Sequence, residues 1–363
     1  MPGRVLGILS GDPHWRLHAG IRGRMATIND VARLAGVSIS TVSYTLSGNR
    51  SIAESTRNRV VTAIQELGYR PNAGARMLAG TRTRIFALTA PVRPDTQAGV
   101  LMSFVLAVAT AARKIDYDVL LLTADEASTG LERVTSSRLA DGIIALDVSL
   151  DDERMSLLRA LNIPATVIGV PADTEGLVCV DLDFERAAHL AVSRLADLGH
   201  RSIGLLGLPR ITYDWGANYP LRFRDGFLGA VAERDIDAAM VMPASDMDSI
   251  RRGLDELFST LPNMTALVMH AGESVQTTVL EILAARGISI PGQLSVISAC
   301  AVFDTSEFTP PLDEIPLSAE DSGTRAVELT IRQINGDRTP HVDLLPPRYV
   351  ERGSTGPAPI REP

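Results

Sequence analysis

Beyond residue 84, apolar runs of strand length alternate with amphipathic stretches of helix length. The strand-like runs lie at 85–90, 119–123, 142–146 and 165–168 in a first series, and at 203–206, 240–242, 266–269 and 294–298 in a second. Strands that alternate with helices form parallel sheets covered by helices on both faces. The second series opens with a helix at 184–198, so the pattern predicts two doubly wound parallel-sheet α/β lobes.

Charge is distributed unevenly along the chain. The net charge of −8 over 363 residues, taken alone, argues against a nucleic-acid partner. Residues 1–84, however, contain twelve Arg, no Lys and four acidic residues, a local charge of +8, so the remainder carries −16. A basic N-terminal part joined to an acidic body is compatible with DNA binding by the N-terminal part alone.

The segment 27–68 predicts three short helices. Its cap signals are Thr27 with Asp30, then Gly36, Ser38 and Gly68. A hydroxyl followed three residues later by a carboxylate starts a helix, and glycine commonly ends one. Two short helices joined by a tight turn, with a third packed across them, describe a helix-turn-helix unit, in which the second helix enters a DNA major groove. A three-helix protein-interaction module is the alternative.

These residues resemble the headpiece of lactose-repressor (LacI/GalR) type transcription regulators. The segments that carry the resemblance are 27–32 (TINDVA), 35–43 (AGVSISTVS), 56–57 (TR), 67–72 (LGYRPN) and 75–78 (ARML). The resemblance implies a homodimer on double-stranded operator DNA, with paired hinge helices in the minor groove and Leu78 as a wedge between bases. The DNA-binding candidates are Thr27, Ser38, Ile39, Ser40, Thr41, Ser43, Tyr44, Arg50, Thr56, Arg57, Tyr69, Asn72, Arg76 and Leu78. Tyr44 stands where family members often carry Arg or His, so the operator sequence is not implied.

The acidic body is similar to the type I periplasmic-binding-protein-like core of the same family. The matching segments are 140–144, 180–181, 198–204, 287–291 and 294–297. Paired α/β lobes bind ligands in the crevice at the carboxyl ends of their strands. We therefore expect a small-molecule effector, carbohydrate or a related compound, in a cleft between the lobes.

An aromatic-rich segment supplies most of the effector-binding candidates. Four of the sixteen aromatic residues lie between 213 and 223, and flat rings suit a sugar face or a base. The candidates are Tyr213, Asp214, Trp215, Asn218, Tyr219, Arg222, Phe223, Arg224, His270 and Cys300. The alternative is that these rings form lobe core or dimer surface. Cys300 and Phe223 replace an Asp and an Arg of many family members, which points to a ligand with fewer hydroxyls, a shifted pose or no small-molecule effector.

Domain boundaries follow from these patterns. We expect an extension at 1–24, disordered or upstream of a true start at Met25, a helix-turn-helix domain at 25–70, a hinge at 71–84, a two-lobed body at 85–352 and a disordered tail at 353–363. Lobe 1 is predicted at 85–183 and 315–336, and lobe 2 at 184–312 and 343–352, with a last strand at 344–350.

The sequence favours a cytoplasmic, homodimeric transcription repressor and not an enzyme. The chain contains no GxGxxG opening the first lobe, no GxxxxGK[ST] and no HExxH motif, and no apolar run approaches the roughly 18 to 20 residues of a membrane span. The two cysteines lack the paired spacing of zinc ligands, so no metal or cofactor is expected. A regulator of the same architecture that is ligand-independent or senses a protein partner remains the alternative.

Overall fold

The computed structural model of the chain describes residues 26–47, 51–69, 82–93, 96–123 and 127–359. It divides into two compact units, 1–82 and 83–363, which we describe separately. None of the helices in the described ranges is both long enough and apolar enough to cross a bilayer.

The first unit is the predicted three-helix bundle. Its helices are α1 (Ile28–Ala35), α2 (Ile39–Ser47) and α3 (Glu54–Leu67). One apolar side chain from each helix, Val31, Val42 and Val60, is fully buried in the shared core. α1 and α3 end at Gly36 and Gly68, whose φ angles of 64° and 59° lie in the left-handed region that glycine tolerates best. The three predicted helices and both glycine stops are confirmed.

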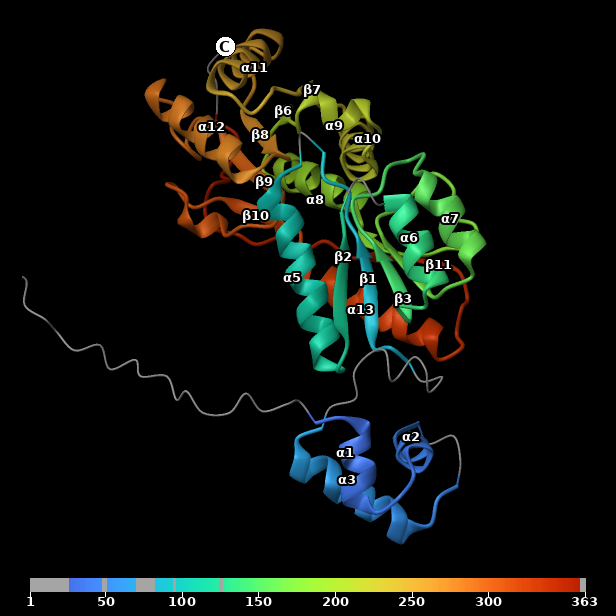
Figure 1. The fold of residues 1–363 in the computed structure, drawn as a ribbon. Helices are drawn as coiled ribbons and strands as arrows, with labels where there is room; N and C mark the ends of the chain where they lie inside the picture. Colours follow the sequence, from blue (N-terminus) through green and yellow to red (C-terminus); the bar gives the residue numbers. More distant parts are fainter. Residues whose placement is uncertain (1–25, 48–50, 70–81, 94–95, 124–126, 360–363) are drawn as a thin grey trace, which may run out of the picture. The chain divides into compact units, whose positions relative to one another are not determined.

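The second unit contains two parallel sheets, one in each lobe (Figure 1). Lobe 1 has strand order β11-β5-β4-β3-β1-β2, and lobe 2 has order β10-β9-β8-β6-β7. The lobe 1 strands are β1 (Ile85–Thr89), β2 (Asp118–Leu122), β3 (Gly142–Ala145), β4 (Ala165–Ile168), β5 (Val178–Leu182) and β11 (His341–Leu345); those of lobe 2 are β6 (Ser202–Leu206), β7 (Asp237–Val241), β8 (Ala266–Met269), β9 (Ser295–Ala301) and β10 (Asp313–Pro316). The inner strands β3 and β9 are buried along their whole length, as parallel strands covered on both faces are.

Helices cover both faces of each sheet. In lobe 1, α5 (Ala98–Lys114) and α13 (Ala319–Ile334) pack together on one face, and α6 (Ala127–Ser136) and α7 (Glu153–Leu161) pack on the other. In lobe 2 the pairs are α8 (Phe184–Asp197) with α10 (Asn218–Glu233), and α11 (Met247–Thr260) with α12 (Glu273–Ala285). Each sheet thus separates two apolar clusters, and the predicted fold class is confirmed.

The structure assigns two C-terminal segments to lobes other than those predicted. Residues 313–316 form β10 of lobe 2, where Asp313 pairs with Ile297, so the predicted return to lobe 1 at 315 is too early. The last strand, predicted at 344–350 in lobe 2, is β11 of lobe 1 and pairs with β5. It ends before Pro346 and Pro347 because proline has no N–H to donate to a ladder.

The predicted disordered tail is ordered through residue 359. Ser354 is fully buried, and Ala358 N–H donates to the Leu198 carbonyl at 2.9 Å. Composition failed to show this because the segment's partners lie far away in sequence. His200 Nε2 lies 3.1 Å from the Gly356 carbonyl, and the Gly356 N–H donates to Ser295 Oγ at 3.0 Å.

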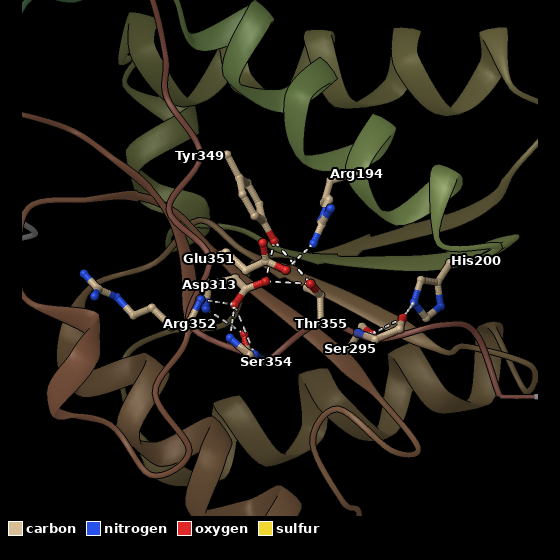
Figure 2. A network of polar contacts seen from close by, with 11 residues as sticks. Arg194, His200, Ser295, Asp313, Tyr349, Glu351, Arg352, Ser354 and Thr355 are labelled. Atoms are coloured by element: carbon tan, nitrogen blue, oxygen red, sulfur yellow. Dashed lines mark hydrogen bonds and ion pairs between the residues drawn. The ribbon is translucent and has the colours of Figure 1, made fainter.

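Asp313, at the start of β10, organises this C-terminal segment (Figure 2). The backbone N–H groups of Arg352, Gly353 and Ser354 donate to Asp313 Oδ1 at 2.6–3.1 Å. The hydroxyls of Tyr349 and Thr355 donate to Oδ2, both at 2.6 Å. Five donors therefore converge on one buried carboxylate, which replaces its lost hydration.

Replacing Asp313 by Asn tests this network. Asn keeps the shape of the side chain. In the variant, however, an NH₂ group replaces a carboxylate oxygen that accepts hydrogen bonds in the wild type, so donors face a donor. We expect the free energy of unfolding to fall by about 3 kcal/mol, measured as a lower urea midpoint. Asp248→Asn, at an exposed position on α11, is the matched control, and we expect a change below about 0.5 kcal/mol. Equal effects of the two substitutions would contradict the role of Asp313.

The same network predicts an acid dependence. Burial raises the pKa of Asp313, but hydrogen bonds from Thr355, Tyr349 and backbone N–H groups outweigh it, and the pKa lies below its usual value. A carboxyl with a lowered pKa in the folded state adds stability above its unfolded pKa and loses it as the pH falls through the folded pKa. The stability gap between wild type and Asp313→Asn should therefore shrink below about pH 4.

Candidate functional site

The helix-turn-helix unit presents α2 as an exposed polar surface. Ser38 caps this helix: its Oγ accepts a hydrogen bond from the Thr41 N–H at 3.1 Å and lies 2.8 Å from Ser40 Oγ. Ile39 is 50% exposed and Tyr44 is 40% exposed. Hydroxyls and an exposed branched apolar side chain on one short helix suit contacts with base edges, phosphates and a thymine methyl group.

Thr27 and Asp30 form the predicted cap of α1. The Thr27 N–H donates to Asp30 Oδ2 at 2.9 Å, and the Thr27 hydroxyl donates to the same oxygen at 2.6 Å. A carboxylate in the first turn also lies at the positive end of the helix dipole. The cap therefore fixes the first turn of α1.

Tyr69 lies in the core of the three-helix unit and not on its surface. After α3 ends at Gly68, the Tyr69 N–H donates to the Ile64 carbonyl at 3.0 Å, which turns the chain back onto the bundle. The ring is 7% exposed, and burial raises the pKa of its hydroxyl. Tyr69 was predicted to contact DNA, and its burial instead makes it a core residue.

The remaining DNA-binding candidates divide into two groups. Arg57 is exposed, whereas Ser43 and Thr56 are partly exposed. Arg50, Asn72, Arg76 and Leu78 lie outside the described residues, as does nearly all of the predicted hinge at 71–84.

A cavity of about 150 Å³ lies between the two lobes of the body. Its walls come from segments at the carboxyl ends of strands in both sheets. They include Leu146–Val148 after β3, Ile168–Gly169 at the end of β4, His270–Gly272 after β8 and Val302–Phe303 after β9. Parallel strands in both lobes thus direct their carboxyl ends to one crevice, as predicted for doubly wound sheets.

Five of the ten effector-binding candidates line this cavity, and five do not. Those that line it are Trp215, Asn218, Tyr219, His270 and Cys300; those that do not are Tyr213, Asp214, Arg222, Phe223 and Arg224. The division follows from helix geometry. α10 begins at Asn218, so its first turn reaches the cavity while its second turn packs into lobe 2 or faces solvent.

The excluded side chains have other partners. Phe223 is fully enclosed in the lobe 2 core, and burial raises the pKa of Tyr213 to about 12. Asp214 pairs with Arg210 at 3.6 Å, and Arg224 pairs with its neighbour Asp225.

Arg222 acts on the cavity through another residue. It pairs with Asp181, a cavity-lining residue on β5, at 2.8 Å, and both side chains are largely buried. Burial raises the pKa of Asp181 to about 7, while Arg222 and the Leu182 N–H act in the opposite direction. Since β5 belongs to lobe 1 and α10 to lobe 2, this pair joins the lobes beside the first crossing of the chain.

His270 lies within a cluster of aromatic rings. Its ring centroid is 4.4 Å from that of Phe223 and 6.1 Å from those of Phe184 and Tyr219. Burial lowers the pKa of His270 to about 3, so the imidazole is neutral at physiological pH. It can therefore donate one hydrogen bond and accept another, but it offers no positive charge.

Cys300 has a left-handed backbone with φ of 56°. The register between β9 and β10 skips this residue, since Ile315 pairs with Ala299 and Pro316 with Ala301. The bulge aims Cys300 at the cavity, and burial raises the pKa of its thiol well above the usual value. The thiol is thus an uncharged group in the cavity wall. The family resemblance implies that many members have a carboxylate at this position.

None of the predicted effector-binding residues lies in lobe 1. The structure adds Gln97, Phe104 and Asp147 among others. Each of these residues follows a predicted strand in the sequence, and that position is the signal by which they could have been found. Asp147 pairs with Arg93, whose guanidinium lies 3.9 Å from the ring centroid of Trp215 in lobe 2.

A buried arginine positions one part of the lobe 1 wall. Arg154 pairs with Asp152 at 2.6 Å and donates to the carbonyls of Leu146 and Asp147 at 3.0 and 3.1 Å. The following residues meet lobe 2, where the Leu150 N–H donates to the Gly216 carbonyl at 2.9 Å. The wall segment is thus fixed from both sides.

The described residues contain no group of three or more His, Cys, Asp or Glu side chains placed to hold a metal ion. The cavity instead offers hydrogen-bonding groups in a mostly apolar wall, which suits reversible binding of a small organic molecule.

Tyr69 and Tyr44 provide a test of these placements. Tyr69→Ala removes a core ring, and we expect it to destabilise the three-helix unit by about 3 kcal/mol. Tyr44→Ala removes an exposed ring and should change stability by less than about 0.5 kcal/mol. Hydrogen exchange of peptides covering 28–67 in the full chain measures both. Faster exchange in Tyr44→Ala than in Tyr69→Ala would contradict the described core.

Two family models match the chain. Residues 27–72 match the bacterial regulatory proteins of the lacI family, and residues 192–355 match a periplasmic binding protein-like domain. The first match covers the three-helix unit, and the second covers most of lobe 2 and the C-terminal segments.

Relatives with the same organisation match almost from end to end. HTH-type transcriptional regulator RegA of Clostridium saccharobutylicum is 28% identical over 91% of this chain and 100% of its own length. Catabolite control protein A of Staphylococcus epidermidis is 25% identical over 91% of this chain and 99% of its own length. The fold matches a Lac repressor dimer bound to operator with a TM-score of 0.74 and 23% identity, covering 92% of this chain and all of that one. The chain therefore joins a lacI-family DNA-binding domain to a periplasmic binding protein-like domain, has LacI/GalR-type regulators as its relatives, and is a DNA-binding transcription regulator.

Proposed function

We propose that this regulator is a homodimeric, cytoplasmic repressor whose affinity for its operator changes when a small molecule binds the cavity between the two lobes. In this function α2 reads the DNA bases and Arg57 contacts phosphates. Arg50 and Arg76, which lie outside the described residues, contact phosphates as well. No catalytic step is assigned to the chain. A solved relative, the Lac repressor, is a dimer on its operator, and another, CelR, is a complex with cellobiose, which supports both parts.

One observation carries the ligand part of the proposal: both lobes contribute to a single cavity that contains unpartnered polar atoms. Among the described buried side chains, His270 Nδ1 and Asn218 Nδ2 have no hydrogen-bond partner, and both residues line the cavity. Buried polar atoms without partners cost free energy, which a ligand recovers by bonding to them.

A ligand in this position acts on the arrangement of the lobes. It shifts the equilibrium between two arrangements only if it binds them unequally, and contacts from both lobes provide that inequality. Because lobe 1 is joined to the DNA-binding unit through residues 71–84, a change at the cavity has a covalent route to the operator-binding surface.

Titration of a labelled operator tests the function. The operator is first selected from random duplexes with the full chain, and its Kd is then measured by fluorescence anisotropy with and without each compound of a broad panel. A change of tenfold or more by one compound, lost in Asn218→Leu, supports control from the cavity. If the chain binds DNA and no compound changes the Kd, the ligand-independent or partner-sensing alternative replaces it.

The salt dependence of operator binding tests the assignment of phosphate contacts. Each neutralised phosphate adds about −0.9 to the slope of log K against log salt concentration. Arg57→Ala removes one contact from each subunit of a dimer, so we expect the slope to become shallower by about 2. Arg251→Ala, an exposed position on α11, is the control and should leave the slope unchanged. An unchanged slope in Arg57→Ala would mean that Arg57 contacts no phosphate.

A further inference from the structure

The wall of the cavity is mostly apolar. Its apolar side chains include Val100, Leu101, Phe104, Leu146, Val148, Ile168, Phe184, Leu208, Val302, Phe303 and Leu317. They come from both lobes, so an enclosed ligand meets hydrocarbon on either side. Such a wall favours apolar ligand surface. The polar side chains among the lining residues are fewer: Thr96, Gln97, Asp147, Asp181, Thr212, Asn218, Tyr219 and His270.

The charged groups at the cavity are paired with one another. Asp147 pairs with Arg93, and Asp181 pairs with Arg222. Each arginine occupies part of the acceptor capacity of its carboxylate and offsets its charge, which leaves fewer lone pairs for ligand hydroxyls. Within the described part of the chain, neither Lys nor Arg is among the lining residues, so an anionic ligand finds no cation there.

Trp215 offers less stacking surface than the sequence indicated. The Arg93 guanidinium lies over its ring, 3.9 Å from the centroid, in a cation–π contact between the lobes. One face of the indole is therefore covered by protein. The ring that remains central to the cavity wall is His270, which is neutral and surrounded by Phe184, Tyr219 and Phe223.

Asn218 and His270 define the polar requirement of the ligand. Asn218 is 1% exposed and His270 is 4% exposed, and each has one buried nitrogen without a hydrogen-bond partner. Gly169 preserves the position of the Asn218 amide, since a Cβ at residue 169 would lie 3.0 Å from Asn218 Nδ2. A ligand that satisfies both nitrogens needs only one or two hydrogen-bonding groups.

The volume sets the size of the ligand. A cavity of about 150 Å³ accommodates one ring, since an engineered apolar cavity of roughly this volume binds benzene. We infer that the effector is an uncharged, single-ring compound with a largely apolar surface and one or two hydrogen-bonding groups, rather than a polyhydroxylated sugar or an anion. This inference rests on the proposed function and replaces the expected carbohydrate with a different class of ligand.

Three probes separate these classes. Benzamide is an uncharged ring with a carbonyl and an NH₂ group, benzoate is its charged counterpart of similar shape, and D-glucose is a neutral polyol. With the full chain, we expect millimolar benzamide to raise the Tm by about 2 °C or more, because a ligand that binds the folded state stabilises it. Benzoate and D-glucose should bind at least tenfold more weakly by calorimetry.

The outcomes of this comparison are distinct. Tighter binding of D-glucose or benzoate than of benzamide, or no binding of benzamide, overturns the inferred class. Neither result removes the proposed function, which is measured separately as a change in operator Kd caused by any compound.

His270→Phe tests the inference at the level of one atom. Phe preserves the aromatic packing and removes the unpartnered Nδ1, so we expect the ligand-free Tm to rise. The same substitution should weaken benzamide binding at least tenfold. His189→Phe, at a partly exposed position on α8, is the matched control and should leave benzamide binding unchanged. A lower Tm with unchanged benzamide affinity would show that His270 is structural and overturn the assignment.

Discussion

Parallel pairing within both sheets is the constraint on which the site depends. Each strand of a parallel sheet ends at the same edge, so a lobe built this way has one edge rich in strand-to-helix connections. Here the two edges share a cavity, and residues from β3, β4, β8 and β9 connections meet there. The helices on the outer faces bury the sheets, while the connections are free to carry binding groups. The buried strands thus stabilise each lobe, whereas the connections at their carboxyl ends bind the ligand.

The sequence predicted what depends on local patterns. The helices of the first unit follow from caps such as Gly36 and from apolar spacing, and most strands of the body follow from short apolar runs. The position of the cleft followed from the order of these elements. By contrast, the aromatic-rich segment did not show that α10 begins at Asn218, and this one boundary decides why Tyr219 lines the cavity while Phe223 lies in the core. A cluster of aromatic residues in a sequence does not reveal which turn of a helix faces a ligand.

Contacts between distant residues account for the remaining differences. Nothing near Ser354 in the sequence indicates order, because its partners are Asp313 and Val296. In the same way, the pairing of Asp181 with Arg222 across 41 positions leaves this carboxylate with less acceptor capacity for a ligand. Tyr69 differs because its burial depends on a turn after Gly68 that brings the ring back to the bundle. Whether a charged or aromatic side chain can bind a ligand or DNA therefore depends on which other side chains it contacts in the fold.

The route of the C-terminal segments has a consequence for synthesis of the chain. Lobe 1 receives its edge strand from 341–345, and lobe 2 receives the donors for Asp313 from 349–355. Both lobes therefore stay incomplete on the ribosome until residues 341–355 have been translated, whereas the three-helix unit is translated before them. A truncated product that ends near residue 340 would carry the DNA-binding unit on two unfinished lobes. Such fragments would compete for DNA without responding to an effector, unless cellular proteases remove them.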